Sequence, residues 1–343
     1  MRIGLAGVGR IGAFHAATLR DLDAVDSLLL VDAVPGRAAD VAASLAGAGA
    51  GDRAARVEHV DSPDALFAAG IDALVIATAT DAHADLIVRG VDQRLPVFCE
   101  KPVALDLAAT IEVLKRVQAA DVPVQIGFQR RFDAGYAAAR RAVADGRLGW
   151  LHTVRAGTLD PAPPPAAYIA TSGGILRDCG VHDFDAIRWV TGAEVVEVFV
   201  TGGNRGADFF AAANDVDTAA VVSTLSDGTV AEVSLTRYNG AGYDVRLELL
   251  GSAGSMCVGL DDRLPLRSAQ SNVDFPAGEP YPNFIARFLD AYRSELAAFV
   301  EVVAGRGEVA CTVEDALEAC YIAEAGELSR QRHCPVTLAE VRA

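Results

Sequence analysis

Short apolar runs alternate with longer amphipathic stretches through the first 128 residues of the chain. The short runs predict buried parallel strands at 2–6, 28–31, 57–59, 74–77, 97–99 and 124–128. The longer stretches predict helices at 11–22, 36–45, 63–70, 83–91 and 105–120. Strands and helices that alternate in this way are typical of βαβ units. The pattern therefore predicts a doubly wound α/β domain, and we place its boundary between residues 123 and 124.

The pattern changes after residue 128, where single positions alternate between apolar and polar. This alternation predicts strands at 151–159, 195–201, 218–225, 230–238 and 245–250. Helices are expected before residue 145 and at 175–190, 284–303 and 313–330. We therefore expect residues 124–343 to form an α+β domain around an open, mostly antiparallel sheet with helices on one face. Because the other face needs cover, we also expect a homotetramer or homodimer that forms through this sheet.

Length, charge and cysteine usage narrow the class of protein. A chain of 343 residues exceeds what one hydrophobic core usually serves, in agreement with two domains. The net charge of −16 opposes binding to nucleic acid and to anionic membranes, and it favours a neutral substrate. The sequence has no apolar run long enough to cross a bilayer, no signal-peptide pattern, and six scattered cysteines without C-x-x-C spacing. We expect a soluble cytoplasmic protein with reduced cysteines and no metal site.

A glycine pattern lies where the first predicted strand meets the first helix. Residues 7–12 read GVGRIG, which fits G-x-G-x-x-G. Gly7 allows a tight turn, Gly9 has no side chain to block a pyrophosphate, and Gly12 lets the helix lie close to the strand. The free N–H groups at the helix start would then face the phosphates. The motif alone is weak evidence, but its place between a strand and a helix predicts a dinucleotide-binding Rossmann domain.

An acidic residue marks the end of the second predicted strand. Asp32 follows Gly12 by twenty residues, where a carboxylate accepts hydrogen bonds from the adenosine ribose. A carboxylate at this place repels a 2′-phosphate, and the nearest basic residue after it is Arg37. The sequence therefore favours NAD over NADP as the cofactor. The alternative is a structural glycine turn followed by a solvated aspartate.

Other loops at strand ends complete the expected cofactor site, because such loops form the ligand crevice of a doubly wound sheet. Thr78 and Thr80 follow the fourth strand, while His83 is expected to pack beside the cofactor rather than act in chemistry. The predicted cofactor-binding residues are Gly7, Gly9, Arg10, Ile11, Gly12, Asp32, Arg37, Thr78, Thr80, His83, Glu100, Lys101 and Gln129.

Two further features could carry chemistry. Lys101 ends the fifth strand and precedes a proline that fixes its backbone, so we expect this lysine at the crevice. Asp178 and His182 lie four residues apart on one predicted helix, so they share a face. Such a pair could equally be a surface ion pair. The cofactor motif, the lysine and the paired glycines before this helix favour a catalytic role.

Four segments together resemble one family of enzymes. They are residues 1–12 (MRIGLAGVGRIG), 100–102 (EKP), 127–133 (GFQRRFD) and 178–185 (DCGVHDFD). In this order they are similar to the glucose-fructose oxidoreductase, inositol dehydrogenase and MocA family, and most of all to its inositol 2-dehydrogenases. The resemblance covers the whole chain and is more specific for the family than for the substrate. Ala79 and Thr80 stand where the family usually has proline or asparagine, and Cys179 stands where the inositol enzymes often have threonine.

The resemblance implies roles for the candidate residues. The family's catalytic lysine, aspartate and histidine fall on Lys101, Asp178 and His182. When NAD+ oxidises a secondary alcohol, His182 would take the hydroxyl proton and Lys101 would stabilise the developing alkoxide. Asp178 would orient the imidazole or hold a neighbouring hydroxyl. Arg131 is expected to form a structural ion pair. The predicted substrate-binding residues are Lys101, Arg130, Asp178, Cys179, His182 and Tyr238.

The leading hypothesis is NAD-dependent oxidation of a cyclic polyol, with myo-inositol oxidised to 2-keto-myo-inositol. One alternative is the same chemistry on a pyranose sugar or sugar derivative, because rings with several equatorial hydroxyls resemble one another at such a site. A second alternative is a non-catalytic NAD-binding regulatory protein. The three catalytic candidates argue against it, because a sensor needs no proton acceptor.

Overall fold

The computed structural model describes residues 1–47 and 54–342, which form two compact units. The first unit comprises Met1–Gln129 and Asp290–Leu317, and the second comprises Arg130–Leu289 and Glu318–Ala343. The strand Val124–Gly127 is hydrogen-bonded into the sheet of the first unit, and the predicted domain boundary between residues 123 and 124 stays a prediction. The sequence pattern does not predict that a late segment returns to the first unit.

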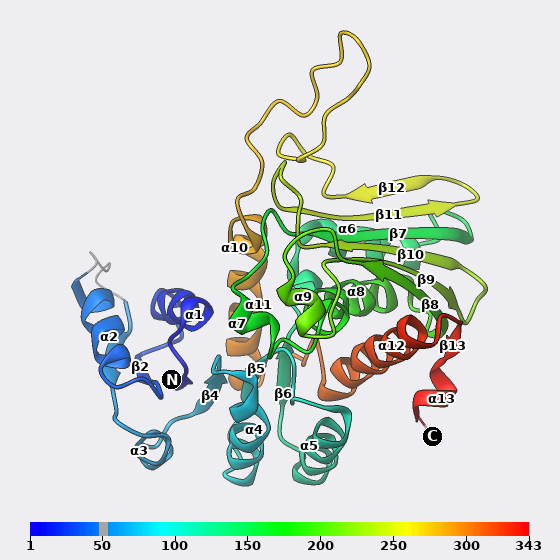
Figure 1. Ribbon diagram of the computed structural model, residues 1–343. Coiled ribbons are helices and arrows are strands. Elements are labelled where there is room, and N and C mark those ends of the chain that lie inside the picture. Colours follow the sequence, from blue (N-terminus) through cyan, green and yellow to red (C-terminus); the bar gives the residue numbers. More distant parts are fainter. Residues whose placement is uncertain (48–53, 343) are drawn as a thin grey trace. The chain divides into compact units, whose positions relative to one another are not determined.

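Among the described residues, six strands form the sheet of the first unit, in the order β3-β2-β1-β4-β5-β6 (Figure 1). They are β1 (Arg2–Ala6), β2 (Ser27–Val31), β3 (Arg56–His59), β4 (Ala73–Ile76), β5 (Val97–Glu100) and β6 (Val124–Gly127). Each neighbouring pair is parallel. This arrangement confirms the predicted Rossmann fold. The strand order reverses between β1 and β4, where such sheets bind ligands at the carboxyl ends of the strands.

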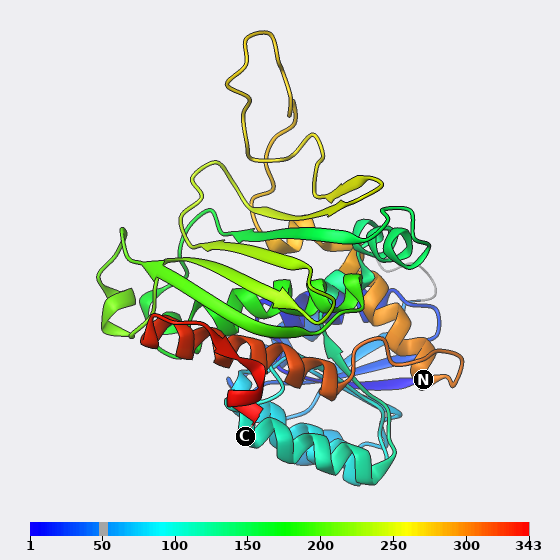
Figure 2. The ribbon, with the colours of Figure 1, turned by 90° about the vertical axis from the view of Figure 1, so that its right-hand side faces the viewer.

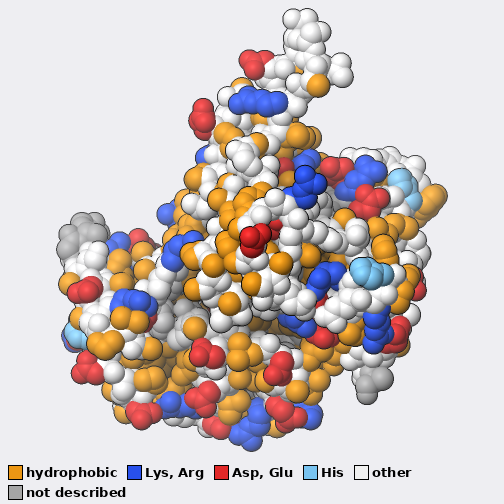
Figure 3. Space-filling model, viewed as in Figure 1, with side chains coloured by type: hydrophobic (Ala, Val, Ile, Leu, Met, Phe, Trp, Pro, Cys, Tyr) orange, Lys and Arg blue, Asp and Glu red, His pale blue; other side chains and the backbone are white. Residues whose placement is uncertain are grey.

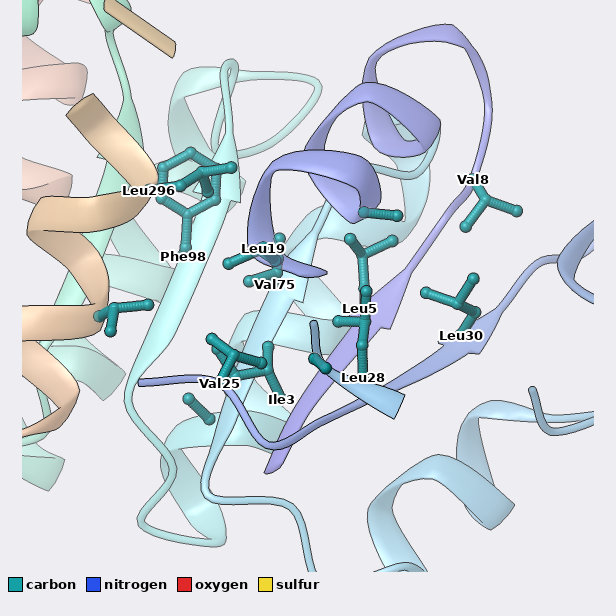
Figure 4. Packing of buried hydrophobic residues seen from close by; sticks show 14 of the residues in the cluster. Ile3, Leu5, Val8, Leu19, Val25, Leu28, Leu30, Val75, Phe98 and Leu296 are labelled. Atoms are coloured by element: carbon teal, nitrogen blue, oxygen red, sulfur yellow. The ribbon is translucent and has the colours of Figure 1, made fainter. Parts of the chain in front are cut away.

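Helices cover both faces of this sheet. They are α1 (Arg10–Arg20), α2 (Arg37–Gly47), α3 (Pro63–Ala68), α4 (His83–Asp92), α5 (Leu107–Ala120) and α11 (Leu289–Val303), with a 3₁₀ turn at Thr80–Ala82. On one face, Leu5 of β1 belongs to a buried cluster with Leu19 of α1 and Leu296 of α11 (Figure 4). On the other, a Cβ added at Gly4 would lie 3.2 Å from Leu66 of α3. Side chains that alternate along a strand therefore place α1 and α3 on opposite faces.

In the second unit, as far as the structure describes it, seven strands form a mixed sheet in the order β12-β11-β7-β10-β9-β8-β13. They are β7 (Leu151–Leu159), β8 (Val195–Gly203), β9 (Thr218–Leu225), β10 (Val230–Thr236), β11 (Asp244–Gly251), β12 (Ser255–Val258) and β13 (Val336–Thr337). Strands β7 and β10 are parallel, and the other pairs are antiparallel. This confirms the predicted open, mostly antiparallel sheet. The sequence pattern does not predict β12 and β13, because they are too short to show an alternation.

The helices of the second unit leave one face of this sheet exposed. They are α6 (Ala134–Ala144), α7 (Ala166–Ile169), α8 (Val181–Thr191), α9 (Phe209–Ala212), α10 (Phe284–Arg287), most of α12 (Val313–Arg332), and α13 (Leu338–Arg342). Helix α12 lies along one face, where Gly326 packs against Val198 and Val200 of β8 (Figure 2). Along β9 and β10, buried and exposed residues alternate. The opposite face is therefore open in a single chain.

One helix prediction is wrong in its extent. The pattern predicts a continuous helix at 284–303, but the structure has the short α10 and then α11. Phe288 between them leaves helical geometry, with φ −112° and ψ 23°. The chain passes from the second unit to the first next to this break. A break in the backbone at a unit boundary leaves no trace in the apolar pattern, which continues through it.

Two surface properties bear on possible partners. Among the described residues, no helix is both long enough and apolar enough to span a bilayer. In the face shown in Figure 3, lysine and arginine side chains are interspersed with acidic ones. Such a mixed surface differs from the clustered basic face of a nucleic-acid-binding domain.

Candidate active site

The glycine loop after β1 has the close contacts that its sequence predicts. Gly7 has a positive φ of 87°, and a Cβ added to it would lie 2.6 Å from the carbonyl of Ala77 after β4. A Cβ at Gly12 would lie 1.9 Å from the carbonyl oxygen of Gly7. Both glycines are therefore required by backbone that passes too close for any side chain. The loop brings the ends of β1 and β4 together at the point where the strand order reverses.

Gly9 differs from these two glycines because the space beside it is open. A Cβ added to it would meet nothing within 4 Å among the described residues. Gly9 is the N-cap of α1, and no side chain caps the helix there. Among the described residues, the first turn of α1 contains no acidic side chain that would compete for its N–H groups. An open helix start of this kind fits a pyrophosphate.

Asp32 fixes the glycine loop from the end of β2. Its Oδ2 accepts a hydrogen bond of 2.8 Å from the backbone N–H of Val8, and its Oδ1 accepts one of 2.8 Å from Val34. Arg37 at the start of α2 lies 3.2 Å from the same Oδ1. The carboxylate is thus held at the end of the cradle by the backbone and balanced by one exposed guanidinium. This geometry is compatible with the predicted contact to a ribose.

The loop after β4 and the loop after β5 are joined by His83. Its ring is 1% exposed, with Nδ1 2.7 Å from the carbonyl oxygen of Pro102 and Nε2 3.1 Å from that of Thr78. The imidazole therefore connects two loops at the carboxyl edge of the sheet. Thr80 begins the 3₁₀ turn that leads into α4. This packing agrees with a supporting role for His83 beside the cofactor.

Lys101 directly follows the end of β5. It is partly exposed, while the preceding Glu100 extends toward α1, where its Oε1 lies 2.6 Å from Nε2 of the buried His15. Sequence reasoning did not select His15, although it lies on the helix that the glycine motif starts. Gln129, at the end of the first unit, is 3% exposed. Glu100 therefore ties the lysine's strand end to the helix of the cradle.

In the second unit, Asp178 lies in an unusual helical turn. Gly173 and Gly174 have positive φ angles of 78° and 90°, and the chain then forms a π-helical turn at Leu176–Gly180 before α8. The predicted regular helix at 175–190 is thus wrong over its first turn. Single π turns interrupt normal i to i+4 bonding and are frequent at functional sites. His182 follows in the first turn of α8.

Both carboxylate oxygens of Asp178 accept a hydrogen bond. Arg237 Nη2 lies 2.7 Å from Oδ2, and the hydroxyl of Tyr168 lies 2.8 Å from Oδ1. Burial raises the pKa of Tyr168, and Asp178 raises it further, so the phenol stays protonated as a donor. Asp178 is therefore a carboxylate fixed from two sides by α7 and by the end of β10.

Arg237 has two more partners, and sequence reasoning missed it. Its Nη1 lies 2.8 Å from Oδ2 of Asp160 and 2.9 Å from the sulfur of Cys179. Burial alone would lower the pKa of Arg237, but Cys179, Asp178 and Asp160 together raise it. The sequence gives only a weak indication of this role, because an arginine at the end of a predicted strand is usually exposed to solvent.

Arg130 is not placed to bind a substrate as predicted. Its side chain is 2% exposed, and the guanidinium donates to Asp183 at 2.6 Å and to Thr158 at 2.6 Å. Burial raises the pKa of Asp183 and the charge of Arg130 opposes that shift. Both terminal nitrogens of Arg130 are thus used inside its own unit, and this buried pair serves the fold. The predicted structural ion pair of Arg131 is confirmed, since it lies 2.5 Å from Asp185.

Tyr238 points away from the Asp178 cluster. Its hydroxyl accepts a hydrogen bond of 3.0 Å from the backbone of Ala207, and its ring lies 6.2 Å from that of Phe210. Neighbouring side chains of an extended backbone point to opposite sides. The preceding Arg237 faces Asp178, so Tyr238 faces the 206–210 loop instead. The prediction that Tyr238 contacts a substrate stays a prediction.

The chain matches two family models. Residues 1–128 match the oxidoreductase family with an NAD-binding Rossmann fold, and residues 136–257 match the GFO/IDH/MocA C-terminal domain. Among curated proteins, an inositol 2-dehydrogenase of Rhizobium meliloti is 34% identical, with 95% of each chain covered. The myo-inositol 2-dehydrogenase of Thermotoga maritima is 32% identical, with 99% of each chain covered.

A solved structure agrees with these matches. The scyllo-inositol dehydrogenase of Lactobacillus casei with bound NAD(H) and scyllo-inositol superimposes with a TM-score of 0.85 at 29% identity, covering 99% of each chain. The glycine cradle on a doubly wound domain, together with the second unit, therefore defines an NAD-dependent oxidoreductase. The chain belongs to the GFO/IDH/MocA oxidoreductase family. This confirms the predicted resemblance and the predicted cofactor class.

Proposed function

We propose that this protein oxidises a secondary hydroxyl of an inositol with NAD+, converting myo-inositol to 2-keto-myo-inositol, and that it works in the cytoplasm. The observation that carries the proposal is Asp178, a carboxylate fixed by two donors in the π turn that directly precedes α8, with His182 four residues later in the first turn of α8. Proteins named inositol 2-dehydrogenases that match nearly the whole chain support this choice of substrate. The reaction can run in either direction with the same groups.

The cofactor requires an anion-binding loop and a partner for a ribose. The open space beside Gly9 and the start of α1 suit the pyrophosphate, and Asp32 suits the ribose hydroxyls. Thr78, Thr80 and Lys101 at neighbouring strand ends complete the set that we assign to the cofactor. NAD+, when bound, accepts the hydride that leaves the substrate carbon.

The remaining chemistry is proton transfer and charge stabilisation by side chains. We assign His182 as the base that takes the hydroxyl proton, since an imidazole titrates near neutral pH. Lys101 stabilises the negative charge that develops on the oxygen. Asp178 orients the imidazole or holds a neighbouring hydroxyl. We further assign Cys179, next to Asp178, to substrate specificity, while a contact of Tyr238 with the substrate stays a prediction.

Initial rates of NADH formation on a panel of polyols and sugars test the proposal. The panel includes myo-, scyllo- and chiro-inositol together with glucose, galactose and xylose. Turnover on one inositol well above that on every sugar supports an inositol dehydrogenase. Preference for a sugar would instead favour the pyranose alternative. NAD+ binding without turnover on any of them would favour the non-catalytic alternative.

We further infer that a second copy of the chain covers the open face of the C-terminal sheet. On that face Phe199 of β8 lies opposite Val222 of β9, and both are exposed, at 39% and 47%. Beside them Glu232 and Arg155 form an ion pair of 3.3 Å. Neighbouring apolar positions and paired charges on an open sheet face suit a symmetric partner.

Light scattering on the double variant Phe199→Glu, Val222→Glu tests this oligomer. The wild type should have the mass of a dimer or tetramer, and the variant should have a smaller mass, because two carboxylates would be desolvated at the interface. Leu105→Glu, at an exposed apolar residue of the first unit, is the control and should keep the wild-type mass. A monomeric wild type, or an unchanged mass in the double variant, contradicts the inference.

A further inference from the structure

We propose that Arg237 is a positioning residue for the reaction, which acts on the substrate through the carboxylate of Asp178. The proposal rests on the proposed function, because it concerns how one of the proposed catalytic groups is held. Arg237 donates a hydrogen bond from Nη2 to Asp178 at 2.7 Å and one from Nη1 to Asp160 at 2.8 Å. One planar cation thus bridges two carboxylates in the arrangement that a guanidinium suits and an ammonium does not.

This bridge is anchored at the ends of two central strands of the sheet, β7 and β10. The backbone N–H of Arg237 donates to the carbonyl of Asp217 at 2.8 Å, and the backbone of Asp160 is bonded to Thr236 at 2.9 Å and Asn239 at 2.7 Å. The ends of β7 and β10, which are paired along their length, therefore hold both Arg237 and Asp160 in place. The hydrogen bond from the guanidinium to Asp178 thereby connects the π turn to these strand ends.

Asp178 needs such an anchor because of its local structure. It lies in the π turn Leu176–Gly180, after two glycines with positive φ. A π turn interrupts the regular hydrogen-bond ladder of an α-helix, so the hydrogen bonds from Arg237 and Tyr168 define where this carboxylate lies. Tyr168 on the short helix α7 supplies the other donor. This second donor is a neutral hydroxyl from a four-residue helix, whereas Arg237 supplies a charged donor from the end of a long strand.

Direct contact between Arg237 and a substrate is not required by this geometry. The side chain of Arg237 is 3% exposed, and both terminal nitrogens are used inside the second unit. The positive charge of Arg237 instead stabilises the negative charges of Asp160 and Asp178. The charged and titratable groups around Asp178 and Arg237 include Tyr168, Cys179 and Asp160, and His182 lies four residues further along the chain. Removing the cation would leave Asp160 and Asp178 as two partly buried neighbouring carboxylates, and their mutual repulsion would favour protonation of one of them.

The test is a double-mutant cycle between Arg237→Met and Asp178→Asn, with kcat, KM and the pH profile of kcat/KM measured for each enzyme. Arg237→Met should lower kcat by roughly 10- to 100-fold, with a smaller change in KM, as loss of an outer partner of a catalytic group does. The acid limb of the pH profile of kcat/KM should move to higher pH in Arg237→Met. Added to Asp178→Asn, it should cause little further loss, because its target is already neutral.

Two further variants separate positioning from general stability. Arg237→Lys should recover part of kcat, because one ammonium can reach one carboxylate but cannot bridge both. Arg287→Met removes another guanidinium of this unit, which is 11% exposed and pairs with Asp133 at 3.0 Å, and should keep wild-type kcat. An unmoved acid limb in Arg237→Lys and Arg237→Met, or fully additive losses in the cycle, overturns the proposal.

A readout without substrate distinguishes this proposal from the proposed function. If the wild type oxidises neither inositols nor sugars, the proposed function fails, and amide hydrogen exchange decides on the positioning role. Exchange at residues 175–183 should then be faster in Arg237→Met, or in Arg237→Lys if the first variant does not fold, than in Arg287→Met. Equal protection of this segment in the variants and the control overturns the role of Arg237 by itself.

Discussion

Asp32 Oδ2 accepts a hydrogen bond of 2.8 Å from the backbone N–H of Val8, so the residue proposed to read the cofactor's ribose also holds the loop proposed to bind its phosphates. The two tasks are joined in one carboxylate at the end of β2. Its other oxygen is held by Val34 and lies 3.2 Å from Arg37. A change at Asp32 should therefore alter both cofactor affinity and cofactor choice.

We expect Asp32→Ala to weaken NAD+ binding by about 10- to 100-fold, which corresponds to the loss of one or two hydrogen bonds to a charged acceptor. NADP+ should lose less, because the variant removes a charge that repels the 2′-phosphate and leaves Arg37 without its carboxylate. Calorimetric titration with both nucleotides measures the two affinities. Asp40→Asn, at an exposed acid of α2, is the control. An unchanged ratio between the two nucleotides would count against the ribose assignment.

Two glycines of the same loop should respond differently to alanine. Gly12→Ala places a Cβ 1.9 Å from the carbonyl oxygen of Gly7, so the backbone must move and the melting temperature should fall. Gly9→Ala meets nothing within 4 Å among the described residues, so its melting temperature should stay near that of the wild type. NAD+ affinity should nevertheless fall in Gly9→Ala, because the methyl group would occupy the space assigned to the pyrophosphate. Full NAD+ affinity in this variant would place the phosphates elsewhere.

The proposed catalytic groups should affect turnover more than cofactor binding. We expect His182→Ala and Lys101→Ala each to lower kcat by roughly 10²- to 10⁴-fold, the range that general acid–base and charge-stabilising groups contribute. Steady-state rates and NAD+ titration measure the two effects separately. Lys115→Ala removes an exposed lysine paired with Glu112 on α5 and should behave as the wild type. Wild-type turnover in a folded Lys101 or His182 variant would remove that residue from the mechanism.

Glu295 predicts a pH-dependent stability of the first unit. It is fully buried in α11, and neither carboxyl oxygen has a hydrogen-bond partner among the described residues. Burial, and next the charge of Glu100, raises the pKa of Glu295 well above its usual range. The folded protein then keeps a proton that the unfolded chain releases above about pH 4.3, so stability falls as pH rises from there toward the raised pKa.

Glu295→Gln should remove this dependence, because the amide has a similar shape and does not ionise. Melting temperatures measured from about pH 5 to about pH 8 should fall less steeply in this variant than in the wild type. The variant should be the more stable protein at the alkaline end. Glu314→Gln, at an exposed acid in the first turn of α12, should keep the wild-type slope. Identical slopes in Glu295→Gln and the wild type would show that Glu295 is ionised in the folded protein.

Sequence periodicity by itself determined the class of each unit and the place of the cofactor cradle. Alternation with a period of two, and apolar runs between amphipathic helices, are properties of neighbouring residues, so they are visible without a structure. The same holds for Gly7, Gly9 and Gly12, whose spacing on a strand, turn and helix follows from local geometry. Asp32 and Lys101 could also be found, because they directly follow predicted strands.

Only the tertiary structure decided which charged groups meet. Asp178 accepts a hydrogen bond from Arg237, 59 positions away along the chain. Arg130 forms a buried ion pair with Asp183, 53 positions away. Such pairs depend on the register and order of strands in the sheet, which the local pattern does not encode. The same reason applies to residues 290–317, whose return to the first unit depends on long-range packing of Leu296 and Phe299 against its sheet. Local patterns determined the elements, and the packing of distant elements decided which side chains surround the candidate catalytic carboxylate.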